Sequence, residues 1–169
     1  MNMDLASDTK SIAVMRLSSF GDVVLTTPVL RALRNKFPHA EIHFIIGETF
    51  QELSNFLPFV DRVIVVPINT GLSGLLQMKK LILAERKNRY DLCIDLHNSY
   101  RTRALRMGLG RSLAVVKSHR MSKLSAVWTK SKVQLPHIVN RYFDAVKKFG
   151  VFSDEKEPEL LLPVKSHPI

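Results

Sequence analysis

The chain has 169 residues, of which 46% are hydrophobic and 24% are charged. This length suits one domain with a core of its own, and this composition excludes a disordered or fibrous chain. The single cysteine, Cys93, excludes an internal disulfide and lies in an apolar run that predicts a core position. The first residues show no basic leader before an apolar stretch, and no run has the length of a membrane span. We therefore expect a cytoplasmic protein.

Basic residues outnumber acidic ones, 25 against 15, which gives a formal net charge of +10. The excess is concentrated in residues 101–132, which contain many arginines and lysines and no aspartate or glutamate. Such a cluster favours an anionic partner: nucleic acid, acidic lipid head groups or a phosphorylated small molecule. A solvated basic surface is the plainer alternative.

Short apolar runs alternate with helical patterns along the chain. The runs rich in β-branched and aliphatic residues predict strands at 12–17, 41–46, 62–66, 91–96 and 113–117. The segments between and after them predict helices at 23–36, 49–56, 73–88, 100–108 and 137–149. This alternation predicts βαβ units, and hence an α/β fold whose parallel sheet is covered by helices on both faces.

Prolines and glycines mark the boundaries. Pro28 lies within the first predicted helix, which either continues with a kink, as we favour, or gives way to a helix capped by Thr27. Gly150 predicts the end of the last helix. We expect one domain over residues 1–152, and a polar, proline-containing connector toward a further domain over 153–169.

Residues 18–22, SSFGD, separate the first predicted strand from the first predicted helix. Ligands bind at the carboxyl ends of parallel strands, and a helix N-terminus favours an anion there. Capping by Ser19 or Asp22 would explain part of this pattern, but two hydroxyls and a carboxylate exceed what a cap requires. Gly21 would permit close backbone approach or a positive φ. Asp22 should be ionised at neutral pH, a weak base that accepts a proton late, as a hydroxyl attacks an activated carbon.

A second polar cluster, DLHNSYRTR over residues 95–103, also follows a predicted strand. His97, Asn98 and Ser99 offer hydrogen bonds to hydroxyl groups, whereas Arg101 and Arg103 can pair with a carboxylate or phosphate. A polar turn followed by a solvated helix face is the structural alternative. Farther along, Trp128 in the basic segment 117–132 is either a core anchor or a wall of a ligand pocket.

Several familiar motifs are absent from the sequence. No G-x-G-x-x-G, P-loop, G-x-S-x-G, Asp-x-Asp or Cys/His zinc pattern is present. We therefore expect neither a metal nor a bound cofactor.

The stretch RLSSFGDVVLTTPVLRALRNKFP closely resembles the N-terminal signature of glycosyltransferase family 9, the lipopolysaccharide heptosyltransferases. The resemblance continues, in order, through AEIHFIIGE, VDRVIVVP, YDLCIDLHNSYRTR and HIVNRYFDAVKKFGV. It covers nearly the whole chain, and the first motif is its most specific part.

The resemblance implies the GT-B architecture, in which two Rossmann-like domains face each other across a cleft. The N-terminal domain of such an enzyme binds the acceptor and the C-terminal domain binds the donor, ADP-heptose. Transfer inverts the anomeric centre without a metal, and the carboxylate that matches Asp22 is the proposed general base. Ser18, Ser19 and Gly21 match the same motif. By position in the family, the basic acceptor contacts fall on Arg120, Lys130 and Lys132.

The implied partners are a lipid A-linked core oligosaccharide as acceptor and a sugar nucleotide as donor. A surface this basic would also suit peripheral binding to the anionic inner face of the cytoplasmic membrane. Family members are about twice as long by the two-domain logic. We therefore expect this chain to fold but to transfer sugar poorly by itself, and its exposed cleft face would favour dimerisation.

Two other functions compete with this interpretation. The first is a non-catalytic domain that binds an anionic glycolipid or nucleic acid. No RRM, KH or helix-turn-helix pattern is present, so we do not expect a nucleic-acid partner. The second, a receiver domain, needs an aspartate at the end of the third strand. Residues 61–67, DRVIVVP, place none there.

Overall fold

The computed structural model describes residues 9–67, 71–85, 87, 89–116 and 137–161. Its strands are β1 (Ser11–Arg16), β2 (Glu41–Gly47), β3 (Arg62–Val66), β4 (Tyr90–Asp95) and β5 (Gly110–Val115). Its α-helices are α2 (Phe20–Val24), α3 (Thr27–Lys36), α4 (Gly71–Glu85), α5 (Tyr100–Leu109) and α7 (Ile138–Val146). Two 3-10 helices, η1 (Glu48–Phe56) and η3 (Lys147–Phe149), complete the described elements.

The described strands form one parallel sheet in the order β3-β2-β1-β4-β5. The chain moves outward from β1 to β3 and then returns to place β4 on the other side of β1. The strand order therefore reverses between β1 and β4, and in such sheets the crevice at that point is the usual ligand site. The predicted parallel α/β fold is confirmed.

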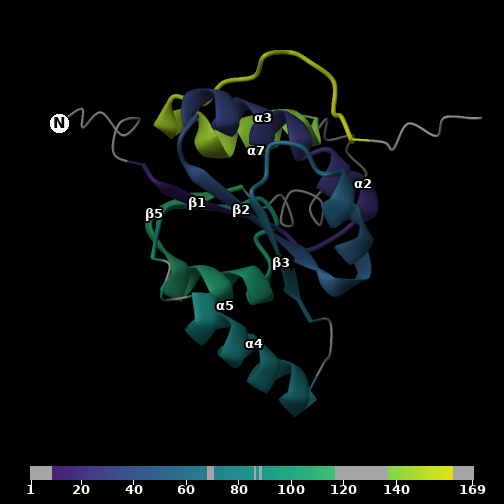
Figure 1. Cartoon of the computed structure of the whole chain (residues 1–169), viewed down its shortest axis with the longest axis vertical. Coiled ribbons are helices and arrows are strands. Elements are labelled where there is room, and N and C mark those ends of the chain that lie inside the picture. The colour runs from purple at the N-terminus through teal and green to yellow at the C-terminus, as the bar shows by residue number, and fades with distance from the viewer. Residues whose placement is uncertain (1–8, 68–70, 86, 88, 117–136, 162–169) are drawn as a thin grey trace, which may run out of the picture.

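Helices cover both faces of this sheet. In Figure 1, α3 and α7 lie on one face, whereas α4 and α5 lie on the other. Within β1, Ile12 and Val14 pack into the cluster that contains α3 and α7 residues. Ala13 and Met15 pack into the cluster that contains α4 and α5 residues, and all four side chains are buried. This two-sided burial explains why the strand has a continuous apolar sequence and not an alternating one.

Cys93 is a core residue, as predicted. Its side chain is fully buried in β4. Burial raises the pKa of the Cys93 thiol to about 12, and the nearby Asp95 carboxylate adds to this effect. The thiol therefore stays protonated and unreactive at neutral pH.

The structure has two helices where we predicted one kinked helix over 23–36. α2 ends at Val24, and α3 begins at Thr27 with Thr26 as its N-cap. Pro28 has no N–H to offer the Val24 carbonyl, and the Thr27 hydroxyl donates to that oxygen instead, at 2.9 Å. The proline therefore separates two helices, close to the alternative in which a threonine caps the second.

Other boundaries differ by a few residues from those predicted. The segment that we predicted as a helix over 49–56 is the 3-10 helix η1, and the last described strand covers 110–115 instead of 113–117. The final helix, predicted over 137–149, ends in the short 3-10 helix η3. Gly150 follows with a left-handed φ of 72°, as a terminating glycine should.

The described start of the predicted connector, residues 153–161, is packed against the domain. Arg31 of α3, only 7% exposed, holds it. Its Nε and Nη2 donate to the two carboxylate oxygens of Asp154, at 2.7 and 3.0 Å. Its Nη1 donates to Glu159 Oε1 at 2.6 Å. One buried guanidinium therefore fixes the path of the segment that leaves the domain.

Candidate functional site

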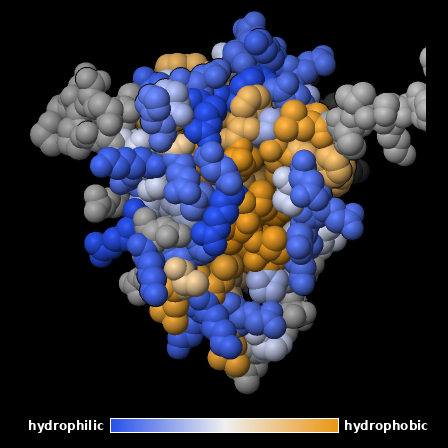
Figure 2. Space-filling view, viewed as in Figure 1, coloured by the Kyte–Doolittle hydropathy of each residue, from blue (hydrophilic) through white to orange (hydrophobic). Residues whose placement is uncertain are grey.

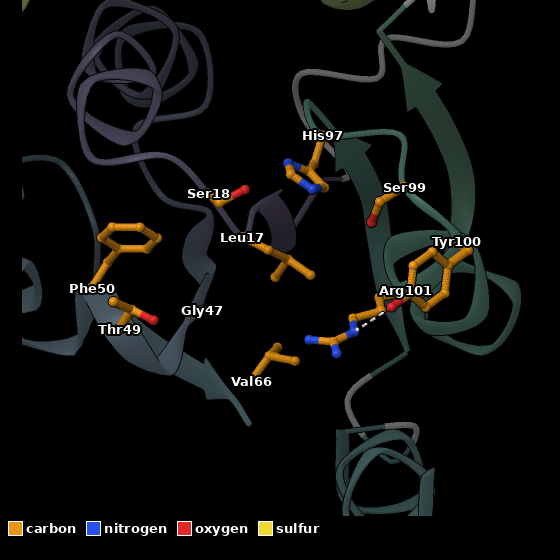
Figure 3. Close-up of a pocket in the computed structure, with 10 residues that line it drawn as sticks. All are labelled: Leu17, Ser18, Gly47, Thr49, Phe50, Val66, His97, Ser99, Tyr100 and Arg101. Atoms are coloured by element: carbon orange, nitrogen blue, oxygen red, sulfur yellow. Dashed lines mark hydrogen bonds between the residues drawn. The ribbon is translucent and has the colours of Figure 1, made fainter. Parts of the chain in front are cut away.

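A cavity of about 320 Å³ opens at the carboxyl ends of β1 to β4, where the strand order reverses. Figure 3 shows Ser18 and His97 on one side of it, Thr49 and Phe50 on another, and the Arg101 guanidinium extending across it. Its lining residues are Leu17, Ser18, Gly47, Thr49, Phe50, Val66, His97, Ser99, Tyr100 and Arg101. The structure thus brings together four residues that the sequence singled out for binding: Ser18, His97, Ser99 and Arg101.

Asp22 lies in the first turn of α2, beside this cavity but not on its wall. Its Oδ2 accepts hydrogen bonds from the Ser19 N–H at 3.3 Å and from the Ser19 hydroxyl at 3.2 Å. The same oxygen pairs with the Arg16 guanidinium. The Ser19 contacts are the helix cap that we weighed as the structural alternative. However, 31% of the Asp22 side chain stays exposed, so capping does not close it off.

The surroundings of Asp22 keep it ionised. Partial burial opposes its charge, but the Arg16 guanidinium and the hydrogen bonds from Ser19 outweigh that effect and lower the pKa of Asp22 below its usual range. The carboxylate is therefore charged at neutral pH. A group of this kind is a weak base, suited to a proton released late in a reaction.

Arg16, the last residue of β1, is a site residue that we did not predict. Its Nη1 donates to the Leu96 carbonyl at 2.7 Å, and its Nη2 pairs with Asp22. The Tyr142 ring of α7 lies 5.7 Å from its guanidinium carbon. In the sequence Arg16 only ends an apolar run. Its partners become visible once β1 and β4 are paired and α7 is packed on the sheet.

The fully buried Asp95 holds the loop that carries His97. Its Oδ1 accepts the N–H groups of His97 at 3.0 Å and Asn98 at 2.7 Å, and its Oδ2 accepts from Arg106 at 3.0 Å. Burial, followed by the charge of Arg16, lowers the pKa of His97. The imidazole is therefore neutral at pH 7. Its buried Nδ1 has no hydrogen-bond partner within the part of the chain that the structure describes.

The other predicted residues of this loop lie off the cavity wall. The Asn98 side-chain amide donates to the Val116 carbonyl at 2.9 Å, and Asn98 adopts a positive φ of 53°. Arg103 is exposed, with a long contact of 3.4 Å from its Nε to the Asn98 oxygen. Asn98 therefore shapes the loop, whereas Arg103 is an exposed residue of α5 that does not line the cavity.

The glycine that lines the cavity is Gly47, not the predicted Gly21. Gly21 is helical and exposed, without a positive φ, so that part of the expectation is wrong. A Cβ added there would meet no described atom, and close approach of a ligand to its backbone stays a prediction. At Gly47, by contrast, a Cβ would overlap the Leu17 carbonyl oxygen. The close approach of β1 to the end of β2 therefore requires glycine at Gly47.

Part of the predicted site lies outside the described residues. Arg120, Lys130 and Lys132 fall there, as does Trp128. Among the residues that the structure does describe, no group of three or more histidine, cysteine, aspartate or glutamate side chains is arranged to hold a metal ion. No helix in that part of the chain is both long and apolar enough to cross a bilayer.

A second hollow of about 320 Å³ adjoins the cavity and shares Thr49 and Phe50 with it. Phe20, Phe56 and Leu160 are among its lining residues, and the Phe20 side chain is 55% exposed. Figure 2 shows that hydrophobic residues also gather in a band over β3, between hydrophilic surfaces. The strand-end face thus offers apolar surface beside its polar groups.

Comparison with known proteins finds no matching family model. Lipopolysaccharide core heptosyltransferase OpsX of Haemophilus influenzae is 22% identical over 160 residues, which cover 90% of this chain and 44% of that protein. Lipopolysaccharide heptosyltransferase 1 of Campylobacter coli is 29% identical over 85 residues, which cover 50% of this chain and 24% of that protein. This chain therefore spans less than half the length of these relatives.

Solved structures agree with the sequence matches. A glycosyl transferase family 9 protein from Veillonella parvula superposes with a TM-score of 0.68 at 25% identity, covering 95% of this chain and 46% of the other. The E. coli heptosyltransferase WaaC, solved with ADP-2-deoxy-2-fluoro heptose, gives 0.66 at 22% identity, covering 88% and 51%. These matches confirm the predicted fold and the predicted resemblance, over part of the length of such proteins.

Proposed function

We propose that this chain, which matches about half of a family 9 heptosyltransferase, is the N-terminal, acceptor-binding half of an inverting, metal-independent glycosyltransferase. The reaction moves heptose from ADP-heptose to the inner core of lipopolysaccharide. The other half of such an enzyme binds most of the donor. This half supplies the acceptor site and the base.

The observation that carries the proposal is a partly exposed, ionised carboxylate, Asp22, beside a cavity at the switch point of the sheet. The acceptor hydroxyl attacks the anomeric carbon of the donor from the side opposite the diphosphate. The new C–O bond forms as the bond to the diphosphate breaks, and ADP departs with that electron pair. The hydroxyl proton passes to Asp22, which later releases it to water.

The cavity wall supplies groups for an anionic, hydroxyl-rich acceptor. Arg101 offers a guanidinium that can pair with a carboxylate or phosphate through two hydrogen bonds. The neutral His97 ring and the hydroxyls of Ser18 and Ser99 suit sugar hydroxyl groups. The net charge of +10 suits the same acceptor and a peripheral position on an anionic membrane surface.

Replacing the base tests the reaction. In a chain that carries both halves, we expect Asp22→Asn to lower the transfer rate by about 10²–10⁴-fold, because the amide cannot take the proton. Asp144→Asn is the matched control, since Asp144 is an exposed acid on α7 away from the cavity. The transfer rate is measured from the release of ADP, and folding of each variant is checked by circular dichroism. A near-normal rate for a folded Asp22→Asn variant would remove the base role.

The charge also favours a second function, binding of an anionic glycolipid or nucleic acid without catalysis. Nucleic-acid binding of this kind is independent of sequence and falls steeply with salt. We expect the chain to show no such affinity for duplex DNA at physiological salt, measured by fluorescence anisotropy. Tight, salt-dependent binding would favour the second function.

A further inference from the structure

We infer that Arg16 is the positioning residue of Asp22: it anchors the Oδ2 oxygen and leaves Oδ1 as the oxygen that receives the proton. The inference rests on the proposed role of Asp22 as base. It adds to that role a second residue, from a different element, and an assignment of the two carboxylate oxygens.

The Arg16 guanidinium is fixed at three points. One terminal nitrogen pairs with Asp22, the other donates to the Leu96 carbonyl at 2.7 Å, and the plane lies near the Tyr142 ring. These partners come from α2, from the end of β4 and from α7. Because the side chain is only 11% exposed, water competes little for these contacts. Arg16 therefore holds α2 in a set orientation relative to the ends of the strands.

All recorded contacts of the Asp22 carboxylate converge on one oxygen. Oδ2 receives Arg16, the Ser19 N–H and the Ser19 hydroxyl. Within the described residues, no group donates to Oδ1. A carboxylate has lone pairs on both oxygens. Contacts to Oδ2 therefore fix the orientation of the group and leave Oδ1 able to accept a proton. Oδ1 is thus the atom available to an acceptor hydroxyl.

Neighbouring groups do not replace the charge of Arg16. His97 faces Asp22 from the β4–α5 loop, but its lowered pKa keeps it neutral at pH 7. Tyr142 faces it from α7, and burial raises the pKa of that phenol to about 12, so it too is neutral. The positive charge of Arg141, next to Tyr142, lowers the pKa of that phenol, but burial outweighs this effect. The guanidinium of Arg16 is the cation that contacts Asp22 among the described residues.

Carboxyl ¹³C NMR of this chain tests the contact without any enzyme assay. Loss of one resonance in Asp22→Asn assigns the Asp22 signal. We expect Arg16→Met to shift the Asp22 titration midpoint upward, because burial then acts without its counter-charge. Arg16→Lys should keep the midpoint close to the wild-type value, since lysine also supplies a positive charge. The matched control is Arg34→Met, which should shift Asp61, the partner of Arg34, and leave Asp22 unchanged.

Kinetics of a chain with both halves test the positioning. Lysine is a point charge and cannot hold Asp22 and the Leu96 carbonyl as a planar fork does. We therefore expect Arg16→Lys to lower kcat by about 10–100-fold with little change in acceptor KM. A lower kcat with an unchanged acceptor KM excludes a loss of acceptor binding, and lysine keeps the positive charge, so the change in kcat reports on positioning.

Two results would overturn the inference: an unchanged Asp22 titration in folded Arg16→Met, or a wild-type kcat in Arg16→Lys. If Arg16→Met does not fold, Arg16→Gln takes its place in the titration. Failure of the proposed function is recognised separately. In that case Asp22→Asn keeps a normal rate, while the titration shift in the Arg16 variants persists.

Discussion

At neutral pH one side chain at the strand ends is ionised and its neighbour is uncharged, and the fold determines both states. Asp22 is ionised because Arg16 and Ser19 outweigh the cost of its burial. His97 is neutral because burial and the charge of Arg16 both disfavour its protonated form. One arginine therefore favours the charged form of the base and the uncharged form of the neighbouring imidazole.

The neutral state of His97 predicts a pH-dependent stability. The unfolded chain binds a proton at a histidine near pH 6.5, whereas the folded chain resists it. Stability from this group is thus complete above about pH 6.5 and is lost as the pH falls toward the lower folded pKa. We expect the free energy of unfolding, measured in urea, to fall more between pH 7.5 and 5.5 in the wild type than in His97→Asn. Parallel curves for the two proteins would contradict this.

At the scale of the elements, the close approach of β1 to the end of β2 requires a residue without a Cβ at Gly47. A Cβ at Gly47 would overlap the Leu17 carbonyl oxygen, so backbone must move. We expect Gly47→Ala to lower the free energy of unfolding by about 1–3 kcal/mol. Gly21→Ala is the control, since its Cβ meets nothing and alanine favours a helix by about 0.5–1 kcal/mol. Equal effects of the two substitutions would refute the close-approach argument.

The segment over 153–161 depends on α3 through Arg31. Its bonds to Asp154 lower the pKa of that carboxyl to about 2, so the stability that Asp154 contributes is present above about pH 4 and is lost as the pH falls toward 2. We expect Arg31→Met to lower the free energy of unfolding by about 2 kcal/mol, because partly buried hydrogen bonds to charged groups are lost.

Hydrogen exchange locates this effect. The Glu159 N–H donates to the Thr27 hydroxyl at 2.9 Å and should lose protection in Arg31→Met, while the amides of β1 keep theirs. Arg34→Met is the control, since its pair with Asp61 is more exposed and worth about 0–1 kcal/mol. Unchanged protection at Glu159 would show that the segment is held without Arg31.

For the molecule as a whole, the order of strands and helices could be predicted because apolar runs and helical periods alternate clearly along the chain. Ser18, His97 and Arg101 could be predicted as cavity residues because each follows a strand that ends at the same edge. Arg16 could not, because its contacts depend on the pairing of strands far apart in sequence.

Two other features were also beyond the sequence. Gly47 follows an ordinary strand pattern, and only the approach of β1 explains it. The break between α2 and α3 depends on hydroxyl bonds to carbonyls that a periodic pattern does not reveal.

Binding of the two proposed substrates to this chain tests the central claim most directly. We would titrate it with the core oligosaccharide acceptor and, separately, with ADP-heptose, following amide shifts by NMR. The account predicts that the acceptor binds at the cavity, that Arg101→Ala weakens it by at least about tenfold, and that Lys87→Ala does not. It also predicts far weaker binding of ADP-heptose. Tight ADP-heptose binding, or acceptor binding that Arg101→Ala leaves unchanged, would contradict an acceptor site at the ends of β1 to β4.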